Sequence, residues 1–224
     1  MDKRLFSIYE ALLSGLDSTL PIVASASGEQ CCLAARESGT GIAMHTPGSS
    51  IAPTFPSGIE GLPLGQAALA LKSWNMEEAS FGLAALNSFY NSPDRLEALN
   101  AALPDTGHYA DGIDFQGLTV GIVGHMRGPK GMKEKAKAVY VLERSPQPGD
   151  YPDTACDYIL PKCDLVIITG SSLINKSLPH LLELCRDAYT ILTGPSVPLC
   201  PALLDFGLDR LAGLVVTNAE AMTA

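Results

Sequence analysis

The stretch Asp164-Leu165-Val166-Ile167-Ile168-Thr169-Gly170-Ser171-Ser172 decides the fold of the second half of this 224-residue chain. Its apolar residues follow one another without the alternation of a half-exposed strand, which predicts a β-strand buried on both faces. The small and polar residues at its end predict a turn into the next element. A strand of this kind is typical of a parallel sheet that is covered on both sides.

Four further apolar runs share this pattern, and turn residues bound each of them. They are 118–123, 138–142, 189–193 and 211–217. Helical stretches are predicted between the strands, at 153–160, 178–186 and 198–206. Alternating strands and helices predict a parallel sheet with right-handed crossovers, and ligands are expected outside the carboxyl ends of its strands. We therefore predict an α/β fold with a doubly wound, Rossmann-like domain over residues 117–224.

The first half of the chain has a different pattern. After an amphipathic helix, short apolar segments follow at 21–25, 31–34 and 41–45, and the brief turns between them predict antiparallel pairing. Helices are expected at 64–73 and 75–90, with Ser73 or Asn75 as the cap of the second. Prolines and glycines interrupt 91–117, apart from a helical run at 94–102. We therefore expect a small α+β domain over residues 1–92 and a linker over 93–116.

The composition narrows the range of partners. A formal net charge of -9 argues against nucleic acid, because such binding rests on clustered Lys and Arg. No apolar run reaches the roughly 18 residues that span a bilayer, and the start lacks the apolar core of an export signal. We therefore expect a cytoplasmic protein that does not enter membranes. The six cysteines form no C-x-x-C pair, so buried free thiols are expected.

Small and polar residues predominate where the predicted parallel strands end. Glycine lets a backbone approach a ligand closely, and a Ser or Thr before a helix leaves N–H groups that favour an anion. The same residues can also simply cap helices and shape turns. Their convergence on one edge of the sheet favours a binding site for a small anionic molecule.

Glu143 is a candidate for contact with a nucleotide ribose. It lies 19 residues after Gly124, close to the offset at which an acidic residue meets the ribose in dinucleotide-binding folds. The phosphate-binding pattern G-x-G-x-x-G is missing from 121–128, which disfavours an ordinary NAD site. A solvated strand end paired with Arg144 or a nearby Lys explains Glu143 equally well.

His125 follows the first parallel strand and is expected to point into the cleft. Imidazole titrates near neutrality, so His125 can serve as a general base, a metal ligand or a donor to an anion. It can also simply bond a backbone carbonyl. His45, His108 and His180 lack a comparable placement, and His180 is predicted at the surface or in a satisfied position.

An ordered set of segments between Leu62 and Asn218 resembles the putative heavy-metal chelation family. The segments include Lys72-Ser73-Trp74-Asn75, Ala79-Ser80-Phe81-Gly82-Leu83-Ala84-Ala85-Leu86-Asn87, Val123-Gly124-His125, Leu142-Glu143-Arg144-Ser145-Pro146, Gly149-Asp150-Tyr151-Pro152, Ile168-Thr169-Gly170-Ser171-Ser172-Leu173-Ile174-Asn175 and Gly194-Pro195-Ser196-Val197-Pro198-Leu199. The resemblance implies an enolase-N-terminal-like domain followed by a Rossmann-like domain, with a cleft between them. It also implies a role in handling metals or a metal-chelating metabolite.

We therefore expect an interdomain site for a small anionic metabolite or a metal chelate, with His125 and Glu143 as the catalytic candidates. Its expected ligand-binding residues are Asn87, Gly124, His125, Glu143, Asp150, Thr169, Gly170, Asn175, Gly194, Pro195 and Ser196. Capture of a bare metal ion is disfavoured, because no cluster of His, Cys, Asp and Glu appears at ligand spacing, so a metal would arrive with its own ligand. One alternative is an enzyme that uses a nucleotide or adenosyl cofactor at Glu143. Another is a regulatory module or homodimer without chemistry.

Overall fold

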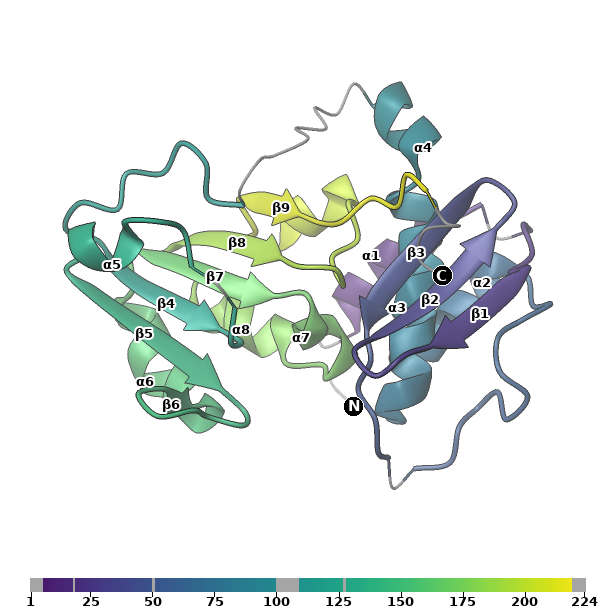
Figure 1. Cartoon of the computed structure of the whole chain (residues 1–224), viewed down its shortest axis with the longest axis horizontal. Helices are drawn as coiled ribbons and strands as arrows, with labels where there is room; N and C mark the ends of the chain where they lie inside the picture. Colours follow the sequence, from purple (N-terminus) through teal and green to yellow (C-terminus); the bar gives the residue numbers. More distant parts are fainter. Residues whose placement is uncertain (1–5, 18, 50, 100–108, 127, 219–224) are drawn as a thin grey trace.

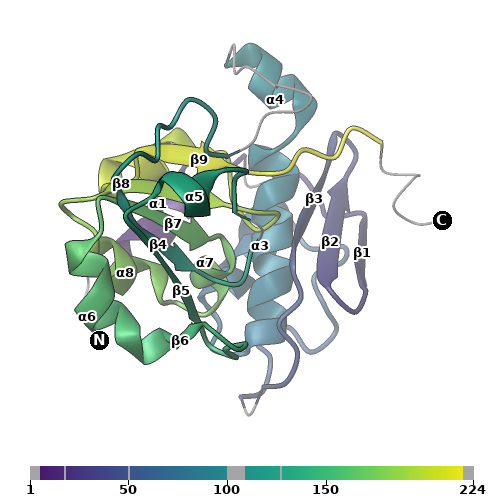
Figure 2. The ribbon, with the colours of Figure 1, turned by 60° about the vertical axis from the view of Figure 1, so that its left-hand side comes forward.

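Two β-sheets organise the protein in the computed structural model, which describes residues 6–17, 19–49, 51–99, 109–126 and 128–218 (Figure 1). One sheet has three antiparallel strands and the other has six parallel strands. Helix α3 lies between them (Figure 2). This arrangement confirms the predicted α/β class with its small α+β portion. The exact division at 1–92, 93–116 and 117–224 stays a prediction.

The N-terminal half begins with a short helix and continues with the antiparallel sheet, in the order β1-β2-β3, and three helical segments. The bounds are α1 Ser7–Ser14, β1 Ala24–Ser27, β2 Cys31–Arg36, β3 Gly39–Met44, α2 Leu64–Leu69, η1 Ala70–Lys72 and α3 Met76–Tyr90. Asn75 caps α3 as expected, because its side chain accepts a hydrogen bond from Glu78 N at 3.0 Å. A Cβ at Gly41 would lie 2.0 Å from Ser88 N, so glycine is what lets β3 touch the backbone of α3.

Helix α4, Pro93–Ala98, connects the halves and ends before the predicted run to 102, part of which falls outside the described residues. The C-terminal half then supplies the parallel sheet and its short helices. The bounds are β4 Thr119–Val123, α5 Met132–Lys135, β5 Ala138–Glu143, β6 Tyr151–Pro152, η2 Asp153–Ala155, α6 Cys156–Ile159, η3 Leu160–Lys162, β7 Leu165–Thr169, α7 Ser171–Ile174, α8 Leu178–Leu184, β8 Tyr189–Thr193, η4 Pro201–Phe206 and β9 Arg210–Ala212.

The strand order β6-β5-β4-β7-β8-β9 places a switch point at the centre of the parallel sheet. The chain runs outward from β4 to β5 and β6, and then returns to the other side of β4 with β7. Loops that follow β4 and β7 therefore leave in opposite directions and open a crevice, which is where doubly wound sheets bind ligands.

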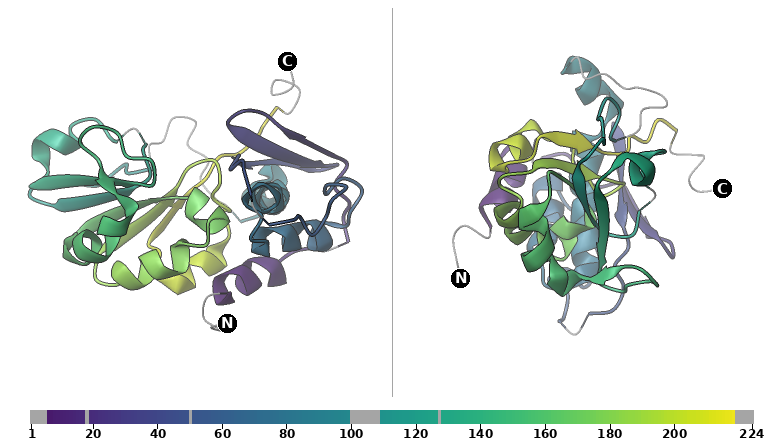
Figure 3. Two further views of the ribbon diagram at one scale, coloured as in Figure 1. Left: turned by 90° about the horizontal axis from the view of Figure 1, so that it is seen from below. Right: turned by 90° about the vertical axis from the view of Figure 1, so that its left-hand side faces the viewer.

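Residues on β7 are buried on both faces of the sheet, as its apolar run predicts. Val166 and Ile168 belong to a large buried cluster on the face that carries α6, α7 and α8, and Leu165 and Ile167 belong to a smaller one on the other face. The green and yellow helices of this half gather on one face of the sheet (Figure 3). The other face is covered by α5 and by side chains of the segment before β4, including Phe115.

The edges of the parallel sheet differ from the prediction in two places. Strand β5 is largely half-buried, because β6 pairs only with its last two residues, Leu142 and Glu143. Strand β9 ends at Ala212 instead of continuing to 217. The chain leaves the sheet there, and the carbonyl of Leu214 instead accepts a hydrogen bond from Asn91 at the end of α3. Local apolar patterning does not encode that long-range contact.

One buried apolar cluster runs through both halves of the molecule. Its members include Tyr9 of α1, Leu86 of α3, Leu173 of α7 and Val197 after β8. The hydroxyl of Tyr9 also donates to the carbonyl of Leu173 at 3.0 Å, and α1 contacts η4. The two halves are thus joined through a shared interior. Among the residues described, we find no helix that is long and apolar enough to cross a bilayer.

Candidate functional site

A pocket of about 680 Å³ lies at the carboxyl ends of the parallel strands and reaches the N-terminal half. It is lined by the predicted residues Gly124, His125, Glu143, Thr169, Asn175, Gly194 and Pro195. Met44 and Thr46, at the end of β3, contribute the wall from the N-terminal half. The structure thus brings seven of the predicted residues together at the strand ends, whereas Met44 and Thr46 were not among the predicted residues.

The switch point sits at the base of the pocket, where the ends of β4 and β7 touch. Gly124 has a φ of +102°, and a Cβ there would lie 2.9 Å from Cγ2 of Thr169. Only glycine fits this backbone and this approach without strain. The described residues directly after β4 form no helix, and α5 begins only at Met132. The helix N-terminus that receives a pyrophosphate in dinucleotide-binding folds is therefore not at this position.

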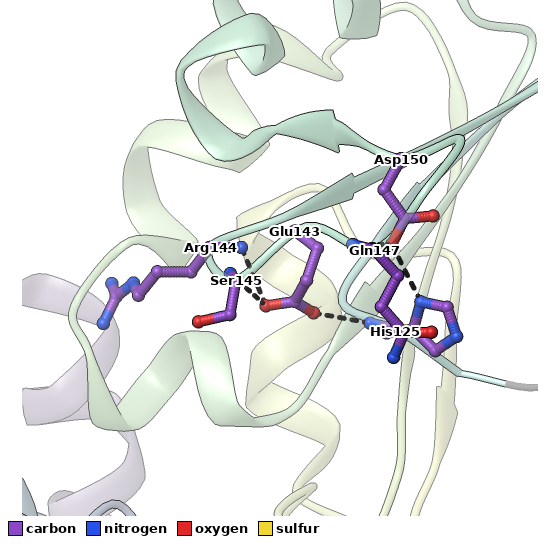
Figure 4. Close-up of polar contacts among 6 residues, drawn as sticks. All are labelled: His125, Glu143, Arg144, Ser145, Gln147 and Asp150. Carbon is purple, nitrogen blue, oxygen red and sulfur yellow. Dashed lines mark hydrogen bonds and ion pairs between the residues drawn. The ribbon is translucent and has the colours of Figure 1, made fainter.

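Glu143 connects the loops that follow β4 and β5 (Figure 4). Its Oε2 accepts a hydrogen bond from His125 N at 2.6 Å, and its Oε1 accepts one from Arg144 N at 2.7 Å. Both carboxylate oxygens thus accept backbone hydrogen bonds, and none of the described basic side chains forms an ion pair with Glu143. It fixes the backbone that carries His125.

His125 is oriented by a second carboxylate, that of Asp150, which stands 2.9 Å from its Nδ1 (Figure 4). The side chain of Asp150 is 8% exposed and that of His125 is 47% exposed. A hydrogen bond from Gln147 N, followed by the contact with His125, keeps the pKa of Asp150 below its ordinary value. An ionised carboxylate at Nδ1 selects the tautomer with the proton on Nδ1, which leaves Nε2 as an acceptor.

A second histidine and carboxylate pair lines the pocket on its helical side. Nε2 of His180 on α8 lies 3.0 Å from Oδ1 of Asp157 on α6, and both side chains are about half exposed. The prediction for His180 was a surface or satisfied position. The structure confirms that it has a partner, but it also places the residue in the pocket wall. His108 lies outside the described residues.

The charges around the pocket are mainly acidic. Glu143, Asp153 and Asp157 line it, and Arg144 is the basic side chain among the described residues that does so. Arg144 Nε lies 3.8 Å from Asp153 Oδ2, so this cation already has an acidic neighbour. Helix α7, which begins at the pocket, is a single turn of four residues and has little dipole to offer an anion.

The predicted residues Asn87, Asp150, Gly170 and Ser196 stand behind the pocket lining instead of in it. Ser196 Oγ accepts a hydrogen bond from Met44 N at 2.8 Å. Asn87 Nδ2 donates to Ile42 O at 2.7 Å and to Pro195 O at 3.2 Å. These contacts hold the two pocket walls together. Direct ligand contact by these residues stays a prediction.

Asn91 and Lys176 are junction residues that sequence reasoning missed. Asn91 Nδ2 donates to Val197 O at 2.9 Å and to Leu214 O at 3.0 Å, and its Oδ1 accepts from Leu199 N at 2.8 Å. Lys176, next to the lining residue Asn175, is buried with a φ of +64°. Its ammonium donates to the carbonyl oxygens of Ser73 and Ile174, and burial lowers its pKa to about 8.

These features define a two-part α/β protein, with a six-stranded parallel sheet, a small antiparallel sheet and a pocket at the carboxyl ends of the parallel strands. The chain belongs to the family described as "Putative heavy-metal chelation", whose DUF364 portion matches residues 113–224 and whose DUF4213 portion matches residues 9–90.

Two solved structures of that family share the fold. A protein with unknown function from Desulfitobacterium hafniense is 34% identical, with a TM-score of 0.85 over 98% of this chain and 89% of its own. A protein with unknown function from Pyrococcus horikoshii is 24% identical, with a TM-score of 0.73 over 97% of this chain and 89% of its own. This likeness supports the fold alone. An uncharacterized protein of Methanocaldococcus jannaschii is 28% identical over 155 residues, which cover 66% of this chain and 58% of that protein.

Proposed function

We propose that this protein binds a small organic metal chelate in the pocket at the carboxyl ends of β4, β5, β7 and β8. The orientation of His125 carries the proposal. Histidines that bind metals usually donate their second ring N–H to a carboxylate, which fixes the tautomer and raises the basicity of the other nitrogen. Asp150 stands in that relation to His125, at 2.9 Å from Nδ1.

The ligand set favours a metal that arrives with its own chelator over a bare ion. Among the residues that the structure describes, no three His, Cys, Asp or Glu side chains gather closely enough to hold a metal. The protein would supply Nε2 of His125, and His180 can add a second nitrogen if its contact with Asp157 shifts. A pocket of about 680 Å³ is far larger than an ion requires and lies within the range of small-molecule sites.

The acidic lining argues against a simple anion as the ligand. Three carboxylates line the pocket against Arg144, which already has a partner in Asp153. A chelated metal offsets the negative charge of its own organic ligand, so such a complex meets less repulsion than the free chelator. The acidic lining therefore favours a metal chelate over a small anionic metabolite, the other ligand type that the sequence predicts.

Binding of nickel nitrilotriacetate to the untagged chain tests this function. The nickel in this complex has open coordination positions that an imidazole can fill. Free nitrilotriacetate carries no metal and therefore offers no such position. Calorimetry is expected to show binding of the nickel complex, a loss of about tenfold or more in His125→Ala, and no binding of the free chelator. Equal binding of the free chelator, or an unchanged affinity in His125→Ala, would refute the proposal. Elemental analysis and native mass spectrometry of gently purified protein identify the natural chelate.

An enzyme that uses a nucleotide or adenosyl cofactor is the second candidate function. The position of the pocket at the β4 and β7 switch point favours it, since cofactors bind there in doubly wound sheets. Glu143 is the residue expected to meet the ribose, although both of its oxygens already accept backbone hydrogen bonds. Titration with adenosine monophosphate and S-adenosylhomocysteine separates the candidates. Absence of binding to the wild type removes the basis of this alternative.

A further inference from the structure

A second pocket, of about 250 Å³, lies in the N-terminal half beneath residues 51–59. Its walls combine the rings of Phe55 and Phe81 with the side chains of Pro53, Glu77 and Glu78. It shares no lining residue with the pocket at the strand ends. The second pocket is therefore a candidate site that is separate from the one in the proposed function.

Two hydrogen bonds hold the covering segment over the first turn of α3. Asn75 Nδ2 donates to Ile51 O at 2.7 Å, and Glu78 Oε1 accepts from Phe55 N at 2.6 Å. Both side chains are buried, at 8% and 7% exposure. The pocket is thus built by specific polar contacts, which fix Phe55 opposite the start of the helix.

Glu78 has an unmet requirement for a hydrogen-bond donor. Its Oε2 is buried and has no hydrogen-bond partner among the described residues. Lys176 is close enough for the charge of Glu78 to raise its pKa, but its ammonium donates to the carbonyl oxygens of Ser73 and Ile174, and Glu78 Oε2 receives no hydrogen bond from it. A buried carboxylate oxygen without a donor is costly, because the solvation that it loses is not replaced.

The chemistry of the walls indicates what would supply the donor. The charged side chains that line the pocket, Glu77 and Glu78, are both acidic. Phenylalanine faces attract cations through their quadrupole, and the proline rings add apolar surface. A metal ion fits less well, because no three metal-binding side chains gather among the described residues. At roughly 30 Å³ per water, the pocket accommodates a ligand of about eight non-hydrogen atoms.

We propose that this pocket binds a small organic ammonium ion. Its charged group donates to Glu78 Oε2, and its hydrocarbon part packs against Phe55 and Phe81. Because Glu78 Oε2 is buried, this contact requires small adjustments of the side chains at the mouth of the pocket. Glu77, whose side chain is 51% exposed, stands at the margin and contributes less, because solvent screens it.

The test compares three probes of the same length: n-hexylammonium, hexanoate and hexan-1-ol. Two-dimensional NMR of the labelled wild-type chain is expected to show binding of n-hexylammonium, with a roughly millimolar dissociation constant and shifts centred on the amides of Phe55 and Glu78. Hexanoate is expected not to bind, and hexan-1-ol is expected to bind at least tenfold more weakly. Equal shifts from all three probes, or none from n-hexylammonium, would overturn the proposal.

Two matched substitutions identify the carboxylate. Glu78→Gln keeps an oxygen for Phe55 N and removes the charge, so affinity for n-hexylammonium should fall by tenfold or more. Glu77→Gln removes the same charge at the exposed position, and a change of less than threefold is expected. Retained affinity in a folded Glu78→Gln variant contradicts the assignment. If this variant does not fold, the comparison of the three probes on the wild-type chain still tests whether the pocket prefers an ammonium ion.

Discussion

Replacement of Asn91 by alanine should weaken the whole fold, because this amide joins three separate backbone segments. The substitution removes hydrogen bonds to Val197 O, Leu214 O and Leu199 N, at 2.9, 3.0 and 2.8 Å. A typical buried hydrogen bond contributes about 1 kcal/mol, and a buried partner left unsatisfied costs about 1–3 kcal/mol. Asn91 is 1% exposed, so water does not readily replace the amide. We expect a loss of about 3–6 kcal/mol in the free energy of unfolding.

Urea unfolding followed by circular dichroism measures this change. A loss of that size is a large fraction of the roughly 5–15 kcal/mol that holds a typical domain together. Glu97→Ala, at an exposed position of α4, is the matched control and should change stability by no more than about 0.5 kcal/mol. If Asn91→Ala costs less than about 1 kcal/mol, water or local relaxation replaces the three bonds, and the reasoning that Asn91 stabilises the fold through them is refuted.

Three further predictions concern the helix-to-sheet contact, the buried lysine and the orientation of His125. Gly41→Ala places a Cβ 2.0 Å from Ser88 N and should cost about 3 kcal/mol or more in urea unfolding; a neutral effect would mean that β3 can move away from α3. The pKa of Lys176 in the folded state is about 8, below its ordinary value of 10.5. Between these two pH values the unfolded chain keeps a proton on Lys176 that the folded chain has lost, so the free energy of unfolding should rise with pH across this window. Lys176→Met should remove this rise in a pH series of unfolding curves, and an unchanged slope would contradict the assignment. Asp150→Asn should weaken binding of nickel nitrilotriacetate by about 10- to 100-fold with little change in stability, whereas unaltered affinity would show that the carboxylate does not support a metal-bound His125.

The core strands were predictable because their environment repeats along the sequence. The apolar run of β7 is buried on both faces, and its neighbours β4 and β8 follow the same rule, so local composition is enough to find them. The edge strands were predicted less accurately. The end of β9 depends on Asn91 capturing Leu214 O, a contact across 123 residues that no local pattern contains.

The candidate site was predictable where it consists of strand ends. Gly124 and Thr169 meet there because parallel strands bring their carboxyl ends to one edge. The pair formed by Asp157 and His180 was missed, because it depends on the rotation of two short helices about their own axes. Asn87 was expected to bind the ligand, and its side chain instead donates to Pro195 O as part of the support of the pocket.

The shared interior limits how the two halves of this protein can evolve. The segments 9–90 and 113–224 match two separate models that share one family description, yet Tyr9, Leu86, Leu173 and Val197 belong to one buried cluster. A recombination event that parted the two segments would leave each with a large uncovered apolar surface, which favours aggregation over folding. We therefore expect these segments to be retained or lost together, and the pocket walls that they build to diversify as a pair.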